Sequence, residues 1–105
     1  MPKGYTKHGA IDLRRLPHIV RRPLGRHGAD GQAYHALFTP NSTEPIPPTI
    51  EIDSRLTGVR RLEIMLHELD HLLHPARPEA AILRENRYLA RVLWACGLRF
   101  EDEED

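Results

Sequence analysis

Residues 57–73 read TGVRRLEIMLHELDHLL, and this stretch decides the fold that the sequence predicts. Leucines at positions 62, 66, 69 and 73 recur at intervals of four, three and four residues, which is the spacing of one face of an α-helix. We therefore expect a long amphipathic helix that begins near Thr57 and packs by its leucine face.

A second helix is predicted directly after the first, over about residues 78–96. Pro75 and Pro78 favour a tight turn, because proline disfavours helix in the residue before it and suits the first turn of a new helix. Gly97 is well placed to end the second helix. Its expected buried side chains are Ile82, Leu89, Val92, Leu93 and Cys96.

Three short strands are expected before the helices, over residues 18–22, 32–38 and 49–53. Each contains β-branched or alternating apolar residues, a composition typical of strands. The stretch 39–48 holds four prolines, which cannot donate to a strand ladder, and is predicted to be a loop. The predicted fold class is α+β: a small, mostly antiparallel sheet of about three strands packed against two antiparallel helices.

Length and composition favour one soluble domain over residues 1–105, with an N-terminal arm at 1–17 and a solvated acidic tail at 101–105. No apolar run could span a bilayer and no apolar leader is present, so we expect a cytoplasmic protein without a membrane partner. Residues 1–27 carry seven Lys or Arg against one Asp. They show no nucleic-acid-binding motif, so a nucleic-acid partner is not expected.

The segment His67-Glu68-Leu69-Asp70-His71 matches the H-E-x-x-H pattern inside the first predicted helix. The two histidines lie one helical turn apart, so both imidazoles can reach one ion. Glu68 is placed to accept a proton from zinc-activated water, whose pKa zinc lowers to about 7. The alternative is that all three are ordinary solvated residues of an amphipathic helix.

A catalytic zinc site of this kind uses three protein ligands, and the third must be found elsewhere. Cys96 is the only cysteine, so the ligands must be histidines and carboxylates. Arg77 occupies the position at which the extended H-E-x-x-H-x-x-G-x-x-H pattern has its third histidine. Because the second helix returns the chain to the motif, we expect the third ligand to be Glu79 or Glu85.

A wider pattern surrounds the motif, made of Ile50-Glu51-Ile52-Asp53, Leu56, Gly58, Pro75, Glu79, Leu89-Ala90-Arg91, Leu93-Trp94 and Gly97-Leu98-Arg99. Together with HELDH, this pattern resembles that of small phage and prophage zinc-peptidase-like proteins of the minimal gluzincin type, over about half of the chain. The resemblance implies a zincin-like fold and a peptide or protein substrate. It also implies that His67, His71 and Glu79 are the zinc ligands and that Glu68 is the catalytic acid/base.

The pattern H-E-x-D-H also resembles the zinc helix of peptide deformylase. That resemblance ends after five residues, because deformylase takes its third ligand from a cysteine before the helix, whereas Cys96 lies after it. Asp70 is then either a partner that orients a ligand histidine or a solvated helix residue.

Other residues near the motif have more than one interpretation. Residues 49–53 could bind an extended peptide along the backbone edge of the strand, as the strand beside the metal helix does in related zincins, or form an internal strand. Tyr34, Tyr88 or a further histidine could stabilise an oxyanion. His74 is expected at a helix C-terminus, where the helix dipole favours a cation.

The predicted function is zinc-dependent hydrolysis of a peptide bond, with Glu68 as general base and Zn²⁺ bound by His67, His71 and Glu79. The alternative is a non-catalytic zinc-binding protein of the phage type, with a regulatory or interaction role. The two differ in their need for Glu68, because only hydrolysis uses its carboxylate.

Overall fold

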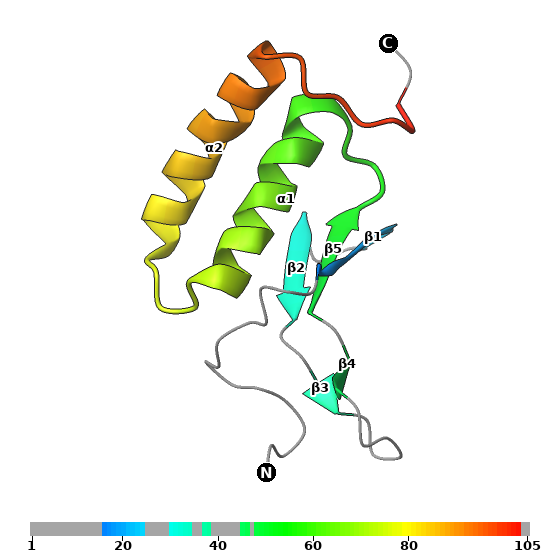
Figure 1. Ribbon diagram of the computed structural model, residues 1–105, viewed down its shortest axis with the longest axis vertical. Helices are drawn as coiled ribbons and strands as arrows, with labels where there is room; N and C mark the ends of the chain where they lie inside the picture. The colour runs from blue at the N-terminus through cyan, green and yellow to red at the C-terminus, as the bar shows by residue number, and fades with distance from the viewer. Residues whose placement is uncertain (1–15, 25–29, 35–36, 39–44, 47, 104–105) are drawn as a thin grey trace.

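The computed structural model describes residues 16–24, 30–34, 37–38, 45–46 and 48–103 (Figure 1). The predicted arm at 1–17 therefore lies almost entirely outside the described residues. Both helices begin and end close to their predicted limits, and two predicted strands match exactly in extent. The elements are β1 (His18–Arg22), β2 (Gly31–Tyr34), β3 (Leu37–Phe38), β4 (Pro45–Ile46), β5 (Thr49–Asp53), α1 (Gly58–Leu73) and α2 (Glu79–Ala95).

A three-stranded sheet carries β5 in its centre, in the order β1-β5-β2. Ile50 of β5 lies opposite Ile19 of the parallel strand β1 and opposite Ala33 of the antiparallel strand β2. A second, two-stranded sheet pairs β3 with β4, also antiparallel. Two of the three pairings among the described strands are antiparallel, which confirms the α+β class and the mostly antiparallel sheet.

Two details of the predicted strands are wrong. The stretch 32–38 is divided into β2 and β3, and the predicted loop contains β4, in which Pro45 pairs with Phe38. A proline cannot donate to the ladder, but its carbonyl can still accept, so a two-residue strand tolerates it. For residues 49–53, the internal-strand interpretation is confirmed, because β5 has both sides paired and offers no backbone edge for an added peptide.

The core lies between β5 and the face of α1 that covers it. Ile50 and Ile52 of β5 pack with Ile64 and Leu72 of α1, and all four are buried. Full burial of an aliphatic side chain of this size contributes about 1.5–3 kcal/mol. These contacts hold α1 on the sheet (Figure 1).

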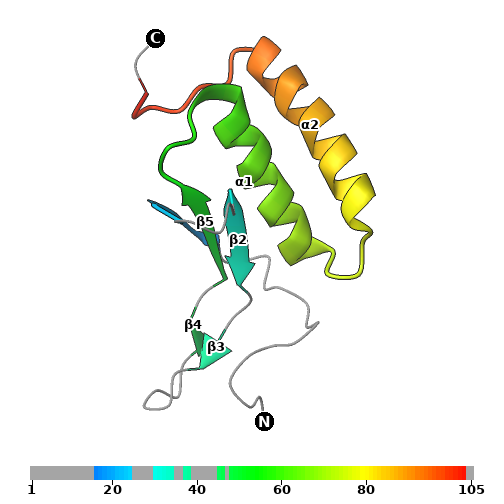
Figure 2. The same ribbon diagram turned by 180° about the vertical axis from the view of Figure 1, so that it is seen from behind.

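The second helix lies beside α1 and extends beyond the sheet (Figure 2). It buries only three side chains, Ile82, Asn86 and Ala90, which follow one another at intervals of four residues and face α1. Neither of the two described helices is long and apolar enough to cross a membrane. The predicted burial is wrong for Leu89, Val92 and Cys96, all of which are exposed.

The C-terminal residues return to the start of α1. Gly58 N donates a hydrogen bond to Glu103 Oε1 at 2.8 Å, which satisfies a helix-terminal N–H that the side chain of Thr57 does not cap. Arg61 forms ion pairs with Asp102 at 2.7 Å and with Glu103 at 2.8 Å. These two acids are therefore held in place by ion pairs, although Asp102 remains exposed to solvent, and residues 104–105 lie outside the described part.

Candidate metal centre

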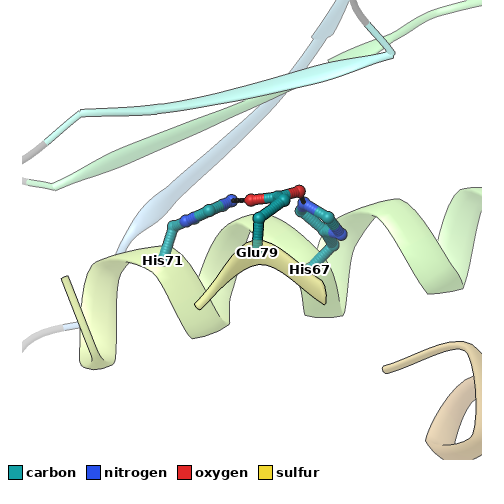
Figure 3. Close-up of side chains that lie close together, drawn as sticks. All are labelled: His67, His71 and Glu79. Carbon is teal, nitrogen blue, oxygen red and sulfur yellow. Dashed lines mark ion pairs between the residues drawn. The ribbon is translucent and has the colours of Figure 1, made fainter. Parts of the chain in front are cut away.

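Three side chains from the two helices meet on one side of α1, with the strands of the sheet above them in Figure 3. His67 Nε2 lies 2.8 Å from Glu79 Oε1, and His71 Nε2 lies 2.9 Å from Glu79 Oε2. One possible ligand atom from each residue lies within 4.8 Å of the others. The His67, His71 and Glu79 cluster could therefore hold a metal ion.

The helix hairpin brings these side chains together. His67 and His71 project from successive turns of α1, because four residues span slightly more than one turn. Residues 74–78 then reverse the chain, and Pro78 enters α2 in an extended conformation with φ −60° and ψ 137°. Glu79 is the first residue of α2, where its negative charge also interacts favourably with the helix dipole.

The helix hairpin places the two carboxylates that were candidates for the third ligand, Glu79 and Glu85, in different surroundings. Glu79 contacts both histidines, whereas Glu85 forms an ion pair with Arg77 at the surface. Cys96 follows Glu79 by 17 residues, which is about 25 Å along a helix axis. It therefore cannot complete a deformylase-like ligand set with the histidines.

The donor atoms of the cluster fit a divalent transition-metal ion, because imidazole nitrogen and carboxylate oxygen are the usual ligands of such ions. His67 is buried, His71 is half-buried and Glu79 is exposed, so the cluster is accessible from solvent. His67 Nδ1 is buried without a hydrogen-bond partner among the described residues. A metal-bound histidine usually has such a partner on its second nitrogen, so the fit rests on the three donors themselves.

Glu68 lies beside the cluster and is only 9% exposed. Its carboxylate has no hydrogen bond or ion pair with any other residue in the described part of the chain. Burial raises the pKa of this carboxyl, the charges of His67 and His71 oppose the rise, and the charge of Glu79 adds to it. A carboxyl with a raised pKa accepts and returns a proton closer to neutral pH.

The strand β2 approaches α1 closely at Gly31, next to Glu68. A Cβ atom at Gly31 would lie 2.7 Å from Ile64 Cγ2, 2.9 Å from Glu68 Cγ and 3.2 Å from the carbonyl oxygen of Glu51. These separations leave no room for a side chain, so glycine permits the approach. Sequence reasoning missed this role, because a close contact between distant segments has no local signal.

Asp70 lies within the motif but faces α2. It is 7% exposed and accepts hydrogen bonds from His74 Nδ1 at 2.8 Å, Arg77 Nη1 at 2.6 Å and Asn86 Nδ2 at 2.8 Å. Burial alone would raise the pKa of this carboxyl, but the hydrogen bonds from Asn86 and His74 and the charge of Arg77 lower it. Both predicted roles are wrong, because Asp70 is neither solvated nor bonded to a histidine of the cluster.

The three partners of Asp70 tie the end of α1 to the turn and to α2. His74 is the C-cap of α1, Arg77 belongs to the turn and Asn86 belongs to α2. Glu79 lies between the last two in sequence, so the contacts of Asp70 fix the start of the helix that carries it. Charged or amide side chains near the motif could have suggested a partner for Asp70, but the sequence does not show which of them face it.

The remaining candidates lie away from the cluster or outside the described side chains. His74 is at the helix C-terminus, as predicted, and its ring donates to Asp70. Tyr88 is 70% exposed and belongs to a different face of the hairpin. The side chain of Tyr34 lies outside the described part of the structure.

Comparisons of this chain with models of protein families, with curated proteins and with solved structures found no match. The chemistry of the cluster is therefore inferred from its own geometry and from the sequence motif.

Proposed function

We propose that this protein is a zinc-dependent metallopeptidase in which His67, His71 and Glu79 bind Zn²⁺ and Glu68 is the general base. Two imidazoles and one carboxylate form a ligand set of catalytic zinc sites, which keep a coordination position open. The described part of the chain contributes no fourth donor to the cluster. The sequence resemblance to minimal gluzincins supports a peptide bond as the substrate.

The surroundings of Glu68 carry this proposal. A nearly buried carboxylate is normally held by hydrogen bonds or ion pairs, because burying an unpaired charge is costly. Glu68 has neither with the described residues, although it lies beside the cluster. A carboxylate without structural partners is free to exchange a proton.

In this proposal, each residue of the site has a separate role in peptide hydrolysis. A bound divalent ion would supply Lewis acidity, which polarises a carbonyl group and makes water easier to deprotonate. His67 and His71 would bind the ion through Nε2 lone pairs, and Glu79 through a carboxylate oxygen. Glu68 accepts the proton of the attacking water on a carboxylate oxygen and returns it to the leaving amine.

The test separates hydrolysis from metal binding by changing Glu68 alone. Zinc content would be measured by mass spectrometry, and hydrolysis with a fluorescence-quenched peptide library. We expect Glu68→Gln to retain zinc and to lose about 10²–10⁴-fold in rate, because the amide cannot accept the proton. Glu101→Gln, on the exposed C-terminal segment, is the matched control and should change neither quantity.

Two outcomes would contradict the proposal. If the protein binds no zinc in a titration, the metal site is wrong. If zinc is bound but Glu68→Gln hydrolyses the library as well as the unchanged protein, or neither hydrolyses it, the non-catalytic zinc-binding role replaces the peptidase.

A further inference from the structure

A surface groove lies between the two helices, where sequence patterning predicted core. We name it the outer groove and define it by Leu66, Leu69 and Leu73 of α1 and by Tyr88 and Leu89 of α2. Its volume is about 720 Å³. Leu73 is 39% and Leu89 42% exposed. Part of the apolar pattern that made both helices look amphipathic therefore lies at the surface, because Leu73 and Leu89 are exposed, while Leu69 is partly buried and also packs against the core.

The outer groove is separate from the metal cluster. Leu69 is two residues from both His67 and His71, so its side chain points to nearly the opposite side of α1. No described residue that lines the groove belongs to the cluster. The two features lie on opposite sides of the contact between α1 and α2, and a molecule in the groove would not occupy the metal site.

The charged side chains that line the outer groove are two acids and two arginines, which do not all pair equally well. Two acids at the groove, Asp70 and Glu85, are already paired with Arg77. Arg84 also lines the groove, is largely exposed and reaches an acid only at 4.0 Å, from Glu85. The groove therefore has an arginine available on its rim.

A neighbouring hollow of about 410 Å³ continues this surface around α2. It shares Arg84 and Tyr88 with the outer groove and adds Arg87 and Arg91, while no acidic residue is among its described lining. Arg87 is 3.4 Å from Glu63, whereas Arg91 has no ion pair with any described residue. Arg84 and Arg91 thus leave two positive charges beside an apolar groove.

We propose that the outer groove binds an amphipathic helix of a partner protein, with leucine-like side chains on one face and Asp or Glu along its flank. Two packed helices leave a groove that accepts a third, and its apolar side chains would cover Leu69 and Leu89. Acidic residues on the flank complement Arg84 and Arg91. A second copy of the same surface would bring like charges together, which disfavours self-association.

The proposal is tested with two synthetic helical peptides of about 18 residues, or five turns. Both carry leucine on one face; one has Glu on the flanks and the other has Lys at the same positions. Fluorescence anisotropy would measure binding of each labelled peptide to the full chain. We expect the Glu peptide to bind at least about tenfold more tightly, a difference of about 1.4 kcal/mol.

Variants locate the binding surface. Leu89→Gln should weaken the Glu peptide roughly tenfold by removing apolar contact, and Arg84→Glu with Arg91→Glu should remove the preference for Glu over Lys. Leu98→Gln, at an exposed leucine outside the groove, is the matched control and should leave binding unchanged. Circular dichroism and zinc content should be the same for all variants, which separates this surface from the metal site.

Three results would overturn the proposal. The first is equal binding of both peptides, or binding that Leu89→Gln does not weaken. The second is a single-stranded oligonucleotide that binds more tightly than the Glu peptide and is lost in the arginine variant, which would assign the surface to nucleic acid. The third is a dimer in sedimentation experiments that Leu89→Gln dissociates, which would make a second copy of this chain the occupant.

Discussion

Two nearly buried carboxylates lie two residues apart on α1, and their surroundings are opposite. Asp70 faces α2 and accepts three hydrogen bonds, whereas Glu68 lies against β2, makes no hydrogen bond among the described residues and has the charges of the cluster beside it. Their pKa values move in opposite directions as a result, raised for Glu68 by burial and lowered for Asp70 by its partners. Two acids of similar burial can therefore have opposite pKa shifts, and their hydrogen-bond partners account for the difference.

The largest effect is expected on the metal side of α1, from loss of a histidine. His67→Ala should weaken zinc binding on the order of 10²–10³-fold, because a structural site gains about 10–16 kcal/mol from four ligands. Folding of the hairpin in the absence of metal should persist, since the contacts of Asp70 remain. Zinc titration and circular dichroism measure the two quantities. His18→Ala, at an exposed histidine, is the control, and equal zinc affinity in both variants would exclude His67 as a ligand.

The next largest effect is expected from a change at Glu79, one of the two candidate carboxylate ligands. Glu79→Ala should lower zinc affinity by about 10²-fold, because it removes the only carboxylate that contacts both histidines in the described structure. Glu85→Ala should retain full zinc stoichiometry, because Glu85 pairs with Arg77 instead. Mass spectrometry after dialysis at limiting zinc distinguishes the two. Full retention by the first variant with loss by the second would reverse the assignment.

A change at Asp70, on the side of α1 that faces α2, should mainly lower the free energy of unfolding. Asp70→Asn removes the charge that Arg77, His74 and Asn86 share, and should lower the free energy of unfolding by about 1–3 kcal/mol. Zinc affinity should fall about tenfold, because the start of α2 is held less firmly. Urea unfolding and zinc titration are the measurements. Asp30→Asn breaks a more exposed ion pair, with Arg60, and should cost less than about 1 kcal/mol.

The close approach of β2 should be sensitive to a single methyl group. Gly31→Ala would place a Cβ within 2.9 Å of Glu68 Cγ and still nearer to Ile64, so the strand or the side chains must move. We expect a loss of about 1–3 kcal/mol in unfolding free energy and a fall in hydrolysis with zinc still bound. Normal stability and normal hydrolysis in this variant would show that the close approach does not position Glu68.

The smallest expected effect lies at the N-terminus of α1. Hydrogen bonds from Arg61 lower the pKa of Asp102 and of Glu103, so their contribution to stability is present above their ordinary pKa values and is lost as pH falls through the lowered ones. Glu103→Gln keeps an oxygen that can accept from Gly58 N but removes the charge that pairs with Arg61, and should cost no more than about 1 kcal/mol at pH 7. Urea unfolding at pH 7 and at about pH 2 should show this difference disappearing in acid. A difference that persists in acid would contradict the ionic contribution.

Local patterns predicted most of the elements and the two candidate histidines, but left Glu79 and Glu85 both open as the third ligand. The helix over Gly58–Leu73 follows from its leucine spacing, and the position of Glu79 follows from the turn that Pro75 and Pro78 enforce. The parallel pairing of β1 with β5 was not predicted, because pairing direction depends on the path of the connecting chain.

Burial in α2 was predicted correctly for Ile82 but wrongly for Leu89, Val92 and Cys96, and the reason is physical. The periodic pattern assigns apolar residues to the core, but the row that faces α1 contains Asn86, whose amide binds Asp70. Leu89 is left on the surface of the outer groove. A polar side chain required by a buried partner therefore outweighs apolar periodicity here, and only the three-dimensional contact reveals it.

The helix α2 buries few side chains of its own, yet it supplies one of the three donors of the candidate metal centre. An ion bound by both helices would stabilise the hairpin. At a free ion concentration one hundred times the dissociation constant, it would add about 2.7 kcal/mol to the free energy of unfolding. The same helix forms one wall of the outer groove. An ion that stabilises the position of α2 would therefore also stabilise that wall of the groove.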